Sequence, residues 1–488
     1  MPVREVPSAM TRKILLFAAG LILGTLIGLF FSYFQISAPE MVVREPAAPG
    51  ESRIEYVPPP PPKVPVSMIK DGLPMLLSMM NDKVEKVADD IYLASGYALA
   101  NVGIVVTKEG LVIIDTTEST EAAEEILAEL RKTTKVPVHT IIYTHYHPDH
   151  NQGTAAFYKE GVRVIATLDN VEYTNYQNDL LGPHHLRSRA TQAGGMAPRY
   201  AFELPVDKNP FRAIGKKVDV IMPTVTFDEE YSFELGGKRF ELFHTSGETP
   251  DHLAVWLPDQ KALFVGDLYY HSFPNLSTPM LESRPIRGWI NSLSRFIDLK
   301  PEFLLPGHTE ALTGAKKIET HLTNYRKAIQ HVHEETVRCI NQGKTADEAV
   351  SEIHLPPDLA SLDYLDEVYG RVAWSIRGIY HGYKGWYDGW GTGLNPLPPH
   401  HRARELVNLA GGADKVLKHA IELQKKGEHQ LTAELCDEVI RANPKDSLAH
   451  RIKAASMRQL AYGFKNMNCF GFYRSAHALH MQAFAEGK

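Results

Sequence analysis

The sequence predicts a layered α/β domain, followed by a mostly helical domain and preceded by a transmembrane helix. Three observations support this prediction. Short apolar runs alternate with helix-like stretches after about residue 67, the C-terminal third has helical periodicity, and an uncharged apolar run lies near the N-terminus. At 488 residues, the chain is long enough for two or three folded units.

The apolar run covers residues 14–34 and predicts a membrane-spanning helix, because about 20 apolar residues cross a bilayer. Arg4, Arg12 and Lys13 precede it, so the positive-inside rule predicts a cytoplasmic N-tail. We therefore expect a single-pass membrane protein whose folded domains are extracytoplasmic (periplasmic, lumenal or extracellular). Residues 35–66 are proline-rich and predict a stiff linker that holds these domains off the membrane.

Residues 67–326 show the alternation that is typical of an α/β domain. Strands are predicted over residues 91–93, 102–106, 111–115, 138–143, 162–166, 231–235, 239–245, 253–257 and 262–265. A helix is predicted over 119–132, where glutamate is frequent in the early part. In such a domain the functional loops lie at the ends of strands.

Residues 327–480 predict a helical domain. An amphipathic stretch covers 324–342, and residues 413–458 indicate paired helices, with Gly427 at a turn. Two interpretations stay open for these helices. We favour a dimer interface, and the alternative is a short peptide-binding array that resembles a tetratricopeptide unit.

Composition excludes some partners. The net charge of −6 gives no basic surface, so we expect no nucleic acid partner. The three cysteines lie far apart in the sequence and predict buried thiols rather than disulfides or a cysteine-rich metal site.

Three histidines and an aspartate fall within six residues, directly after the strand predicted over 138–143. His145 and His147 are spaced to approach one ion together, whereas Asp149 and His150 point to a neighbouring volume. Imidazole and carboxylate are ligands that zinc and similar ions prefer. The sequence therefore predicts a metal site, with a second ion beside the first.

Several motifs together resemble those of metallo-β-lactamase-fold hydrolases. They are Asp115 and the stretches 144–150, 244–250, 265–267 and 305–308, which occur in the family's order. The resemblance implies an αββα sandwich with a binuclear metal site at one edge, most simply two Zn²⁺ ions. It also implies the ligands, which are His145, His147 and Glu248 for the first ion, Asp149, His150 and His308 for the second, and Asp267 as the bridge.

Glu248 narrows the resemblance, because most members of the superfamily have histidine at this position. Glutamate there is similar to the alkylsulfatase branch. The stretches 355–357, 369–370, 385–389, 395–399 and 411–414 resemble signature stretches of the alkylsulfatase dimerisation domain. This resemblance implies a homodimer formed through the helical domain. Asp115 is expected to orient a metal ligand by accepting a hydrogen bond.

The residues expected to contact the substrate depart in part from the alkylsulfatase pattern. Asn275 matches the family's sulfate-contacting asparagine, but Pro274 and Met280 stand where a histidine and a sulfate-binding arginine usually occur. Two replacements for the arginine stay open, Arg284 and Arg287, and we expect Arg284. For His271 two interpretations stay open, a replacement proton donor, which we expect, and an ordinary hydrogen-bonded loop histidine.

The expected reaction is hydrolysis of an alkyl sulfate or a related amphiphilic ester. Metal lowers the pKa of bound water to roughly 7, so the expected nucleophile is a metal-bound hydroxide that Asp149 orients. Two alternatives stay open. One is another hydrolase of the same fold, acting on a lactone, thioester or β-lactam, and the other is a scaffold that keeps the fold without catalysis.

Overall fold

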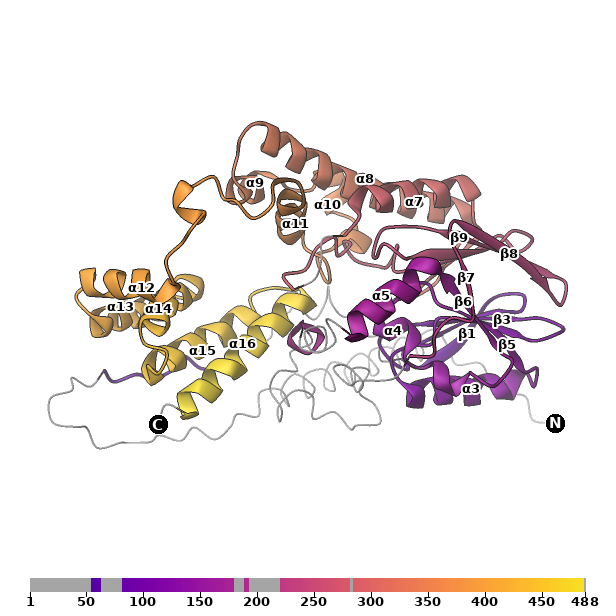
Figure 1. Ribbon diagram of the computed structural model, residues 1–488, viewed down its shortest axis with the longest axis horizontal. Helices are drawn as coiled ribbons and strands as arrows, with labels where there is room; N and C mark the ends of the chain where they lie inside the picture. The colour runs from indigo at the N-terminus through magenta and orange to yellow at the C-terminus, as the bar shows by residue number, and fades with distance from the viewer. Residues whose placement is uncertain (1–53, 63–80, 180–187, 193–219, 281–283, 487–488) are drawn as a thin grey trace, which may run out of the picture.

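The computed structural model describes residues 54–62, 81–179, 188–192, 220–280 and 284–486. Within this part, the α/β domain has a seven-stranded and a six-stranded sheet, and side chains from both sheets form one core between them. Helix α3 (Thr120–Thr133) covers the outer face of the first sheet, and α7 (Ile286–Leu299) and α8 (Ala315–Asn341) cover the second (Figure 1). This is the αββα arrangement that the resemblance implied.

The first sheet runs in sequence order. Its strands are β1 (Lys83–Ala88), β2 (Ile91–Ser95), β3 (Val102–Val106), β4 (Leu111–Ile114), β5 (Val138–Ile142), β6 (Arg163–Thr167) and β7 (Val225–Phe227). The strands from β1 to β4 pair antiparallel, and those from β4 to β7 pair parallel. Helix α3 makes the crossover from β4 to β5, so the carboxyl ends of these two strands lie at the same edge of the sheet.

The second sheet contains the strands β8 (Glu230–Leu235), β9 (Lys238–His244), β10 (Leu253–Leu257), β11 (Ala262–Gly266), β12 (Phe303–Pro306) and β13 (Leu312–Thr313). Strands β11 and β12 are parallel, and α7 crosses between them. Backbone hydrogen bonds join this sheet to the first. Leu253 N–H donates to the carbonyl of Thr144 at 2.7 Å, and Asn101 N–H donates to the carbonyl of Gly307 at 2.7 Å.

Helix α3 shows why the local sequence folds as it does. Ser119 caps its N-terminus by accepting a hydrogen bond from the Ala122 N–H, and Arg131 and Lys132 lie in its last turn, where the helix dipole favours positive charge. Its buried residues lie on one side, including Ile126 and Leu130, and pack on the sheet. The helix therefore begins and ends within one residue of the prediction.

The C-terminal part is helical, as predicted. Its longer helices are α11 (Val372–Lys384), α12 (Pro399–Leu409), α13 (Ala413–Lys425), α14 (His429–Ala442), α15 (Ser447–Ala461) and α16 (Met467–Glu486). Short helices α9 (Ala346–Glu352) and α10 (Pro357–Ala360) precede them. Helix α8 runs without a break through the predicted boundary at residue 326, so the domain limits 67–326 and 327–480 stay predictions.

Part of the predicted linker 35–66 packs on the C-terminal helices. Residues 54–62 are described, and Tyr56 is only 7% exposed in a core formed with α12 to α15. Figure 1 shows this short indigo stretch among the orange and yellow helices, far from the indigo strands of the α/β domain. The predicted linker 35–66 therefore includes residues that pack on the helical domain.

The predicted transmembrane helix requires a correction. Among the residues that the structure describes, no helix combines the length and apolar character needed to span a bilayer. Even α8, at 27 residues, carries lysine and glutamate along its exposed face. The segment 14–34 lies outside the described residues. The transmembrane helix is therefore removed from the predicted fold class, which leaves an αββα sandwich followed by a helical domain. The predicted membrane-anchored, extracytoplasmic localisation depended on that helix and is withdrawn.

Candidate metal centre

The predicted ligands come from four loops that meet at one edge of the sandwich. The stretch 144–150 follows β5, and Glu248 lies in the turn between β9 and β10. Asp267 follows β11 and His308 follows β12. Because β5, β11 and β12 all end at this edge, loops that are distant in sequence converge there.

The structure brings all seven predicted ligands together in three overlapping clusters, in each of which the ligand atoms lie within 4.8 Å of one another. The clusters are His145, His150 and Asp267; Asp149, His150 and His308; and His147, Glu248 and Asp267. Asp267 and His150 each belong to two clusters, and Asp267 is the carboxylate of the two. All members are buried.

Two buried atoms in these clusters support a fit for divalent ions. His150 Nε2 and Asp267 Oδ1 have no hydrogen-bond partner in the described chain, although they lie 3.4 Å apart. Unpaired buried polar atoms are costly, and a cation between such nitrogen and oxygen ligands would satisfy both. The donor set is therefore suited to a divalent ion such as zinc.

Asp115 orients this centre, as the sequence predicted. Its Oδ2 accepts from His150 Nδ1 at 2.8 Å and from the Thr144 hydroxyl at 2.8 Å, and its Oδ1 accepts from the Thr144 N–H at 2.7 Å. The bond to Nδ1 fixes the histidine tautomer and leaves Nε2 to face the ligand cluster. Asp115 itself adopts φ of 59°, in the left-handed region.

His308 is oriented by a chain of two hydrogen bonds that the sequence did not predict. Its Nδ1 donates to the carbonyl of Leu99 at 2.8 Å, and the Leu99 N–H donates to Glu118 at 3.0 Å. Burial, with the nearby charge of Asp149, raises the pKa of Glu118 to about 7. A buried carboxyl group therefore holds the loop that positions one predicted ligand.

The electrostatics of the centre shift the pKa values of two neighbouring histidines in opposite directions. Burial opposes protonation of His150, but the carboxylates of Asp267, Asp115 and Asp149 outweigh it and hold its pKa well above the ordinary value. In His145 burial dominates instead, and its pKa lies well below the usual range. Neutral His145 can bind a cation directly, whereas His150 must release its proton to do so.

Arg284 reaches the centre, as proposed from the sequence. Its Nη1 donates to Glu248 Oε2, and the side chain is 5% exposed. Burial lowers the pKa of Arg284 to about 10, so it remains a cation near neutral pH. A buried guanidinium therefore stands beside one predicted metal ligand.

Asn275 is fully buried, and neither atom of its side-chain amide has a hydrogen-bond partner in the described chain. Its backbone N–H donates to the Tyr270 hydroxyl at 2.6 Å, and the centroids of the Tyr270 and His308 rings lie 6.4 Å apart. An unsatisfied amide beside the centre is a suitable contact for a polar ligand.

The structure does not bring the ring of His271 into the clusters. Its Nε2 lies 3.5 Å from Asp363 Oδ2, and its side chain is 35% exposed. Its backbone N–H, in contrast, donates to the Thr309 hydroxyl, directly after His308. The proton-donor role of His271 therefore stays a prediction.

Sequence reasoning missed Arg189 and Tyr369. Arg189 donates to Asp149 Oδ1 at 2.6 Å. Burial raises the pKa of the partly buried Tyr369, and the charges of Arg284 and Arg189 oppose this rise. No motif or spacing in the sequence marks Arg189. Tyr369 belongs to a stretch that resembles the dimerisation domain, yet its loop pairs with the loop of Asn275, as the Gly370 N–H donates to the Phe273 carbonyl at 3.1 Å.

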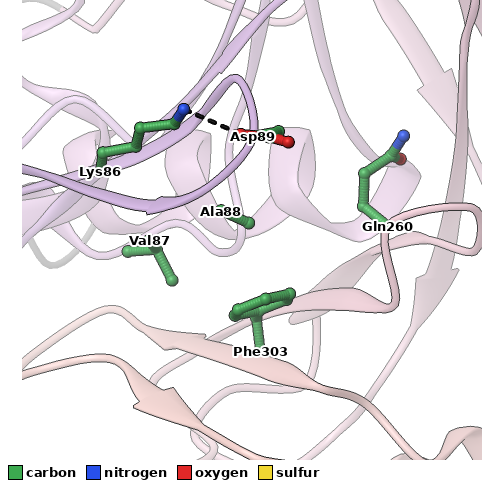
Figure 2. Close-up of a pocket in the computed structure, with 6 residues that line it drawn as sticks. All are labelled: Lys86, Val87, Ala88, Asp89, Gln260 and Phe303. Carbon is green, nitrogen blue, oxygen red and sulfur yellow. Dashed lines mark hydrogen bonds and ion pairs between the residues drawn. The ribbon is translucent and has the colours of Figure 1, made fainter.

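A separate pocket of about 580 Å³ lies at the turn between β1 and β2, beside β12, and is lined by Lys86, Val87, Ala88, Asp89, Gln260 and Phe303. Figure 2 shows the Lys86 ammonium directed at Asp89, 2.8 Å away, and Phe303 on the opposite wall. No predicted site residue lines it. We assign no function to this pocket.

Comparison with known families supports both resemblances. Residues 96–308 match the model described as "Metallo-beta-lactamase superfamily", and residues 345–482 match "Alkyl sulfatase dimerisation". The predicted order of a metallo-β-lactamase-fold domain and an alkylsulfatase dimerisation domain is confirmed.

Individual relatives carry related names. A linear primary-alkylsulfatase of a Pseudomonas species is 35% identical over 391 residues, which cover 78% of this chain and 73% of the relative. An alkyl/aryl-sulfatase of Saccharomyces cerevisiae is 29% identical over 77% of this chain and 60% of the relative. The structure of an inverting sec-alkylsulfatase from Pseudomonas sp. aligns with a TM-score of 0.75 at 27% identity, over 82% of this chain and 66% of that one. The chain thus spans less than two thirds of the last two.

Proposed function

The chain belongs to the alkylsulfatase family of metallo-β-lactamase-fold proteins, and on that premise we propose that it is a metal-dependent hydrolase of alkyl sulfates or related amphiphilic sulfate esters. The observation that carries this proposal is the convergence of the seven ligand side chains, including Glu248, beside a buried cation and an unsatisfied amide. The fold itself implies a divalent metal. We propose that the seven side chains of the three clusters would hold two such ions, most simply Zn²⁺, with Asp267 available to both.

Ions held there would lower the pKa of a bound water and polarise the ester. The protein's own residues orient the reactants. Arg189 holds Oδ1 of Asp149, which leaves Oδ2 to face His150 and His308, at 3.7 Å and 3.5 Å. We therefore assign to Asp149 the orientation of the attacking water, and to Arg189 the orientation of Asp149.

The sulfate group would meet Arg284 and Asn275. The guanidinium supplies positive charge with paired donors, which suits an anionic oxygen. The Asn275 amide is buried and without a partner in the described chain, so a sulfate oxygen would satisfy its donor group. Arg284 would thereby bind the sulfate group in place of the family's sulfate-binding arginine, whose position is occupied by Met280 in this chain.

The test is hydrolysis of sodium dodecyl sulfate by full-length variants. Arg284→Ala is expected to lower kcat/KM about 100-fold, because it removes the proposed contact with the sulfate group. At about 1.4 kcal/mol for each factor of ten, this corresponds to about 2.8 kcal/mol of lost transition-state binding. Asn275→Ala should act in the same direction. Arg287→Ala is the matched control, because Arg287 lies three residues after Arg284, in the first turn of α7, and is exposed. Equal rates for Arg284→Ala and Arg287→Ala would contradict the substrate assignment.

Metal content and substrate range separate the alternatives. Wild type should bind divalent metal in proportion to two ions per chain, and His147→Ala should lose part of it. A protein that hydrolyses lactones or β-lactams but no sulfate ester would contradict the proposed substrate class. A metal-loaded protein without any hydrolytic activity would favour the scaffold.

His271→Gln tests the proposed proton donor. A donor to the leaving group acts in the chemical step, so its loss lowers kcat and changes the pH profile. If His271 serves only its loop, through Asp363 and Thr309, kcat and its pH profile stay unchanged.

We also propose a homodimer formed through the helical domain. The segment between α11 and α12 exposes large apolar side chains, with Trp386 and Trp390 each 71% exposed and Leu397 70% exposed. Exposed apolar side chains in one segment are typical of an interface. Sedimentation equilibrium should give a dimer for wild type and a weaker one for Trp386→Ser/Trp390→Ser. A wild-type monomer at all concentrations would exclude it.

A further inference from the structure

The C-terminal helices hold an extended segment of the chain in a way that resembles recognition of a peptide. Tyr56 inserts its ring among α12, α13, α14 and α15, and Ile54 packs at the edge of the same cluster. The side chain of Val57, in contrast, is 80% exposed. Alternate side chains of residues 54–57 thus face the helices and the solvent, as in an extended strand.

The Tyr56 hydroxyl has a specific partner inside the helical domain. It donates to Gln424 Oε1 at 2.8 Å, and Gln424 Nε2 donates to the carbonyl of Ile452 at 3.1 Å and to the Ser456 hydroxyl at 2.7 Å. Gln424 is 5% exposed. Tyr56 therefore satisfies the acceptor of a buried glutamine that joins α13 to α15, and a phenylalanine could not.

The proline run is held by side-chain donors. Proline has no N–H, so a run of prolines offers only carbonyl acceptors. Helix α15 supplies the matching groups, since Arg458 donates to the Pro59 carbonyl at 2.8 Å and Gln459 donates to the Pro60 carbonyl at 2.7 Å. A proline run is already extended before it binds, so little conformational entropy is lost.

We propose that the C-terminal helical domain contains a binding site for a proline-rich segment of the pattern Ile-x-Tyr-x-Pro-Pro-Pro, and that the chain's own residues 54–62 occupy it. The site has an apolar pocket for the tyrosine ring, an amide acceptor for its hydroxyl and two donors for successive proline carbonyls. The helical domain thereby fixes the N-terminal segment of the chain. This function is separate from dimerisation and does not rest on the proposed sulfatase activity.

A labelled peptide with the sequence of residues 52–63 tests the site in the full-length protein. The peptide is expected to bind weakly to wild type, where the segment occupies the site, and at least about tenfold more tightly to Ile54→Ala/Tyr56→Ala, where it does not. Val57→Ala is the matched control and should behave as wild type, because its side chain is exposed. A peptide that carries Tyr56→Ala should not bind. Equal peptide affinity for wild type and the double variant would overturn the proposal.

Footprinting of wild type gives an independent answer that does not depend on any variant folding. Hydroxyl-radical oxidation of Tyr56, which is 7% exposed, should be slow relative to Tyr383, which is 56% exposed. In Arg458→Ala/Gln459→Ala, oxidation of Tyr56 should rise toward that of Tyr383. Equal oxidation of the two tyrosines in wild type would show that the segment does not occupy the site.

Discussion

Glu248 is both a predicted metal ligand and the ion-pair partner of the buried Arg284. Its carboxylate lies 3.9 Å from His147 and also accepts from Arg284. A neutral imidazole in its place could join a metal cluster but could not balance a buried guanidinium, and an unpaired buried charge is strongly unfavourable. Glutamate at this position therefore permits a cation beside the ligands. We expect Glu248→His to impair sulfate ester hydrolysis even where metal still binds, and an unchanged rate would contradict this.

Gly307 gives a sharper prediction at the metal centre. A Cβ atom at this position would lie 2.5 Å from Asp267 Oδ1 and 2.9 Å from His150 Cε1. Gly307→Ala is therefore expected to displace two predicted ligands and to reduce metal affinity at least about tenfold, as seen when ligand geometry is disturbed. Metal titration of the apoprotein measures this. Gly391→Ala is the control, because nothing lies within 4 Å of its Cβ position, and equal affinities for the two variants would refute the prediction.

Asp251 should make stability depend on pH. It is fully buried and accepts from Asn170 at 2.9 Å, and burial raises its pKa from 3.8 to about 6. A raised pKa means that the folded state binds the proton more tightly than the unfolded chain. The corresponding stability is present below about pH 4 and is lost as pH rises toward about 6, and it amounts to about 3 kcal/mol at most.

Asp251→Asn removes this ionisation and keeps the shape of the side chain. Urea unfolding of the apoprotein between about pH 4.5 and 7 should show a smaller fall in free energy for the variant than for wild type. Asp259→Asn, at an exposed position, should follow wild type. Parallel curves for wild type and Asp251→Asn would contradict the assignment.

At the scale of elements, α7 positions two of the ligand loops. Trp289 Nε1 donates to the carbonyl of Leu268, directly after Asp267, at 2.9 Å. Ser292 donates to the carbonyl of Ser246, two residues before Glu248, also at 2.9 Å. One helix on the outer face of the second sheet therefore sets the spacing of both loops.

Trp289→Phe is expected to lower the free energy of unfolding by about 1–3 kcal/mol, because it leaves a buried carbonyl without a donor. It should also weaken metal binding, since Leu268 adjoins Asp267. Chemical denaturation and metal titration measure the two effects. Asn291→Ala, exposed on the same helix, is the control and should change stability by less than about 0.5 kcal/mol. Loss of stability with unchanged metal affinity would show that Trp289 stabilises the fold but does not position Asp267.

Element prediction succeeded where the pattern was periodic and local. Strands β3 and β10 begin and end at the predicted residues, and α3 was placed within one residue at each end. Helix α7 and strands β1 and β7 were missed. Strand β1 has the sequence KVEKVA, and each of its positions is partly buried or exposed. It is therefore a strand because β2 pairs with it, not because of its own pattern.

At the scale of the whole molecule, the two domains share one site. Loop 366–370 of the helical domain pairs with the loop of Asn275, since the Phe273 N–H donates to the Asp366 carbonyl at 2.8 Å. Helix α16 contacts the stretch that carries Arg189, as Ser475 donates to the Thr191 carbonyl at 2.8 Å. The helical domain therefore builds part of the wall around the metal centre.

Metal removal should consequently destabilise more than the metal loops. A ligand that binds only the folded state contributes about 2.7 kcal/mol at a concentration of 100 Kd. Dialysis against a chelator is expected to lower the apparent Tm, and re-addition of Zn²⁺ should restore it. Trypsin cleavage should also increase in the loop 366–370 region, because that loop packs against the site. An apoprotein with the Tm of the holoprotein would show that the centre does not bind metal tightly.

The sequence by itself determined the family and predicted the candidate metal ligands. Local motifs predicted the seven ligand positions, the role of Asp115 and the order of the domains. They could do so because a few consecutive residues specify which ligand types and which turn occur at a strand end. Only the tertiary structure decided which other side chains join them. Arg189, Tyr369 and the docked Tyr56 reach their positions through contacts between segments that are far apart in sequence, and no local pattern encodes such contacts.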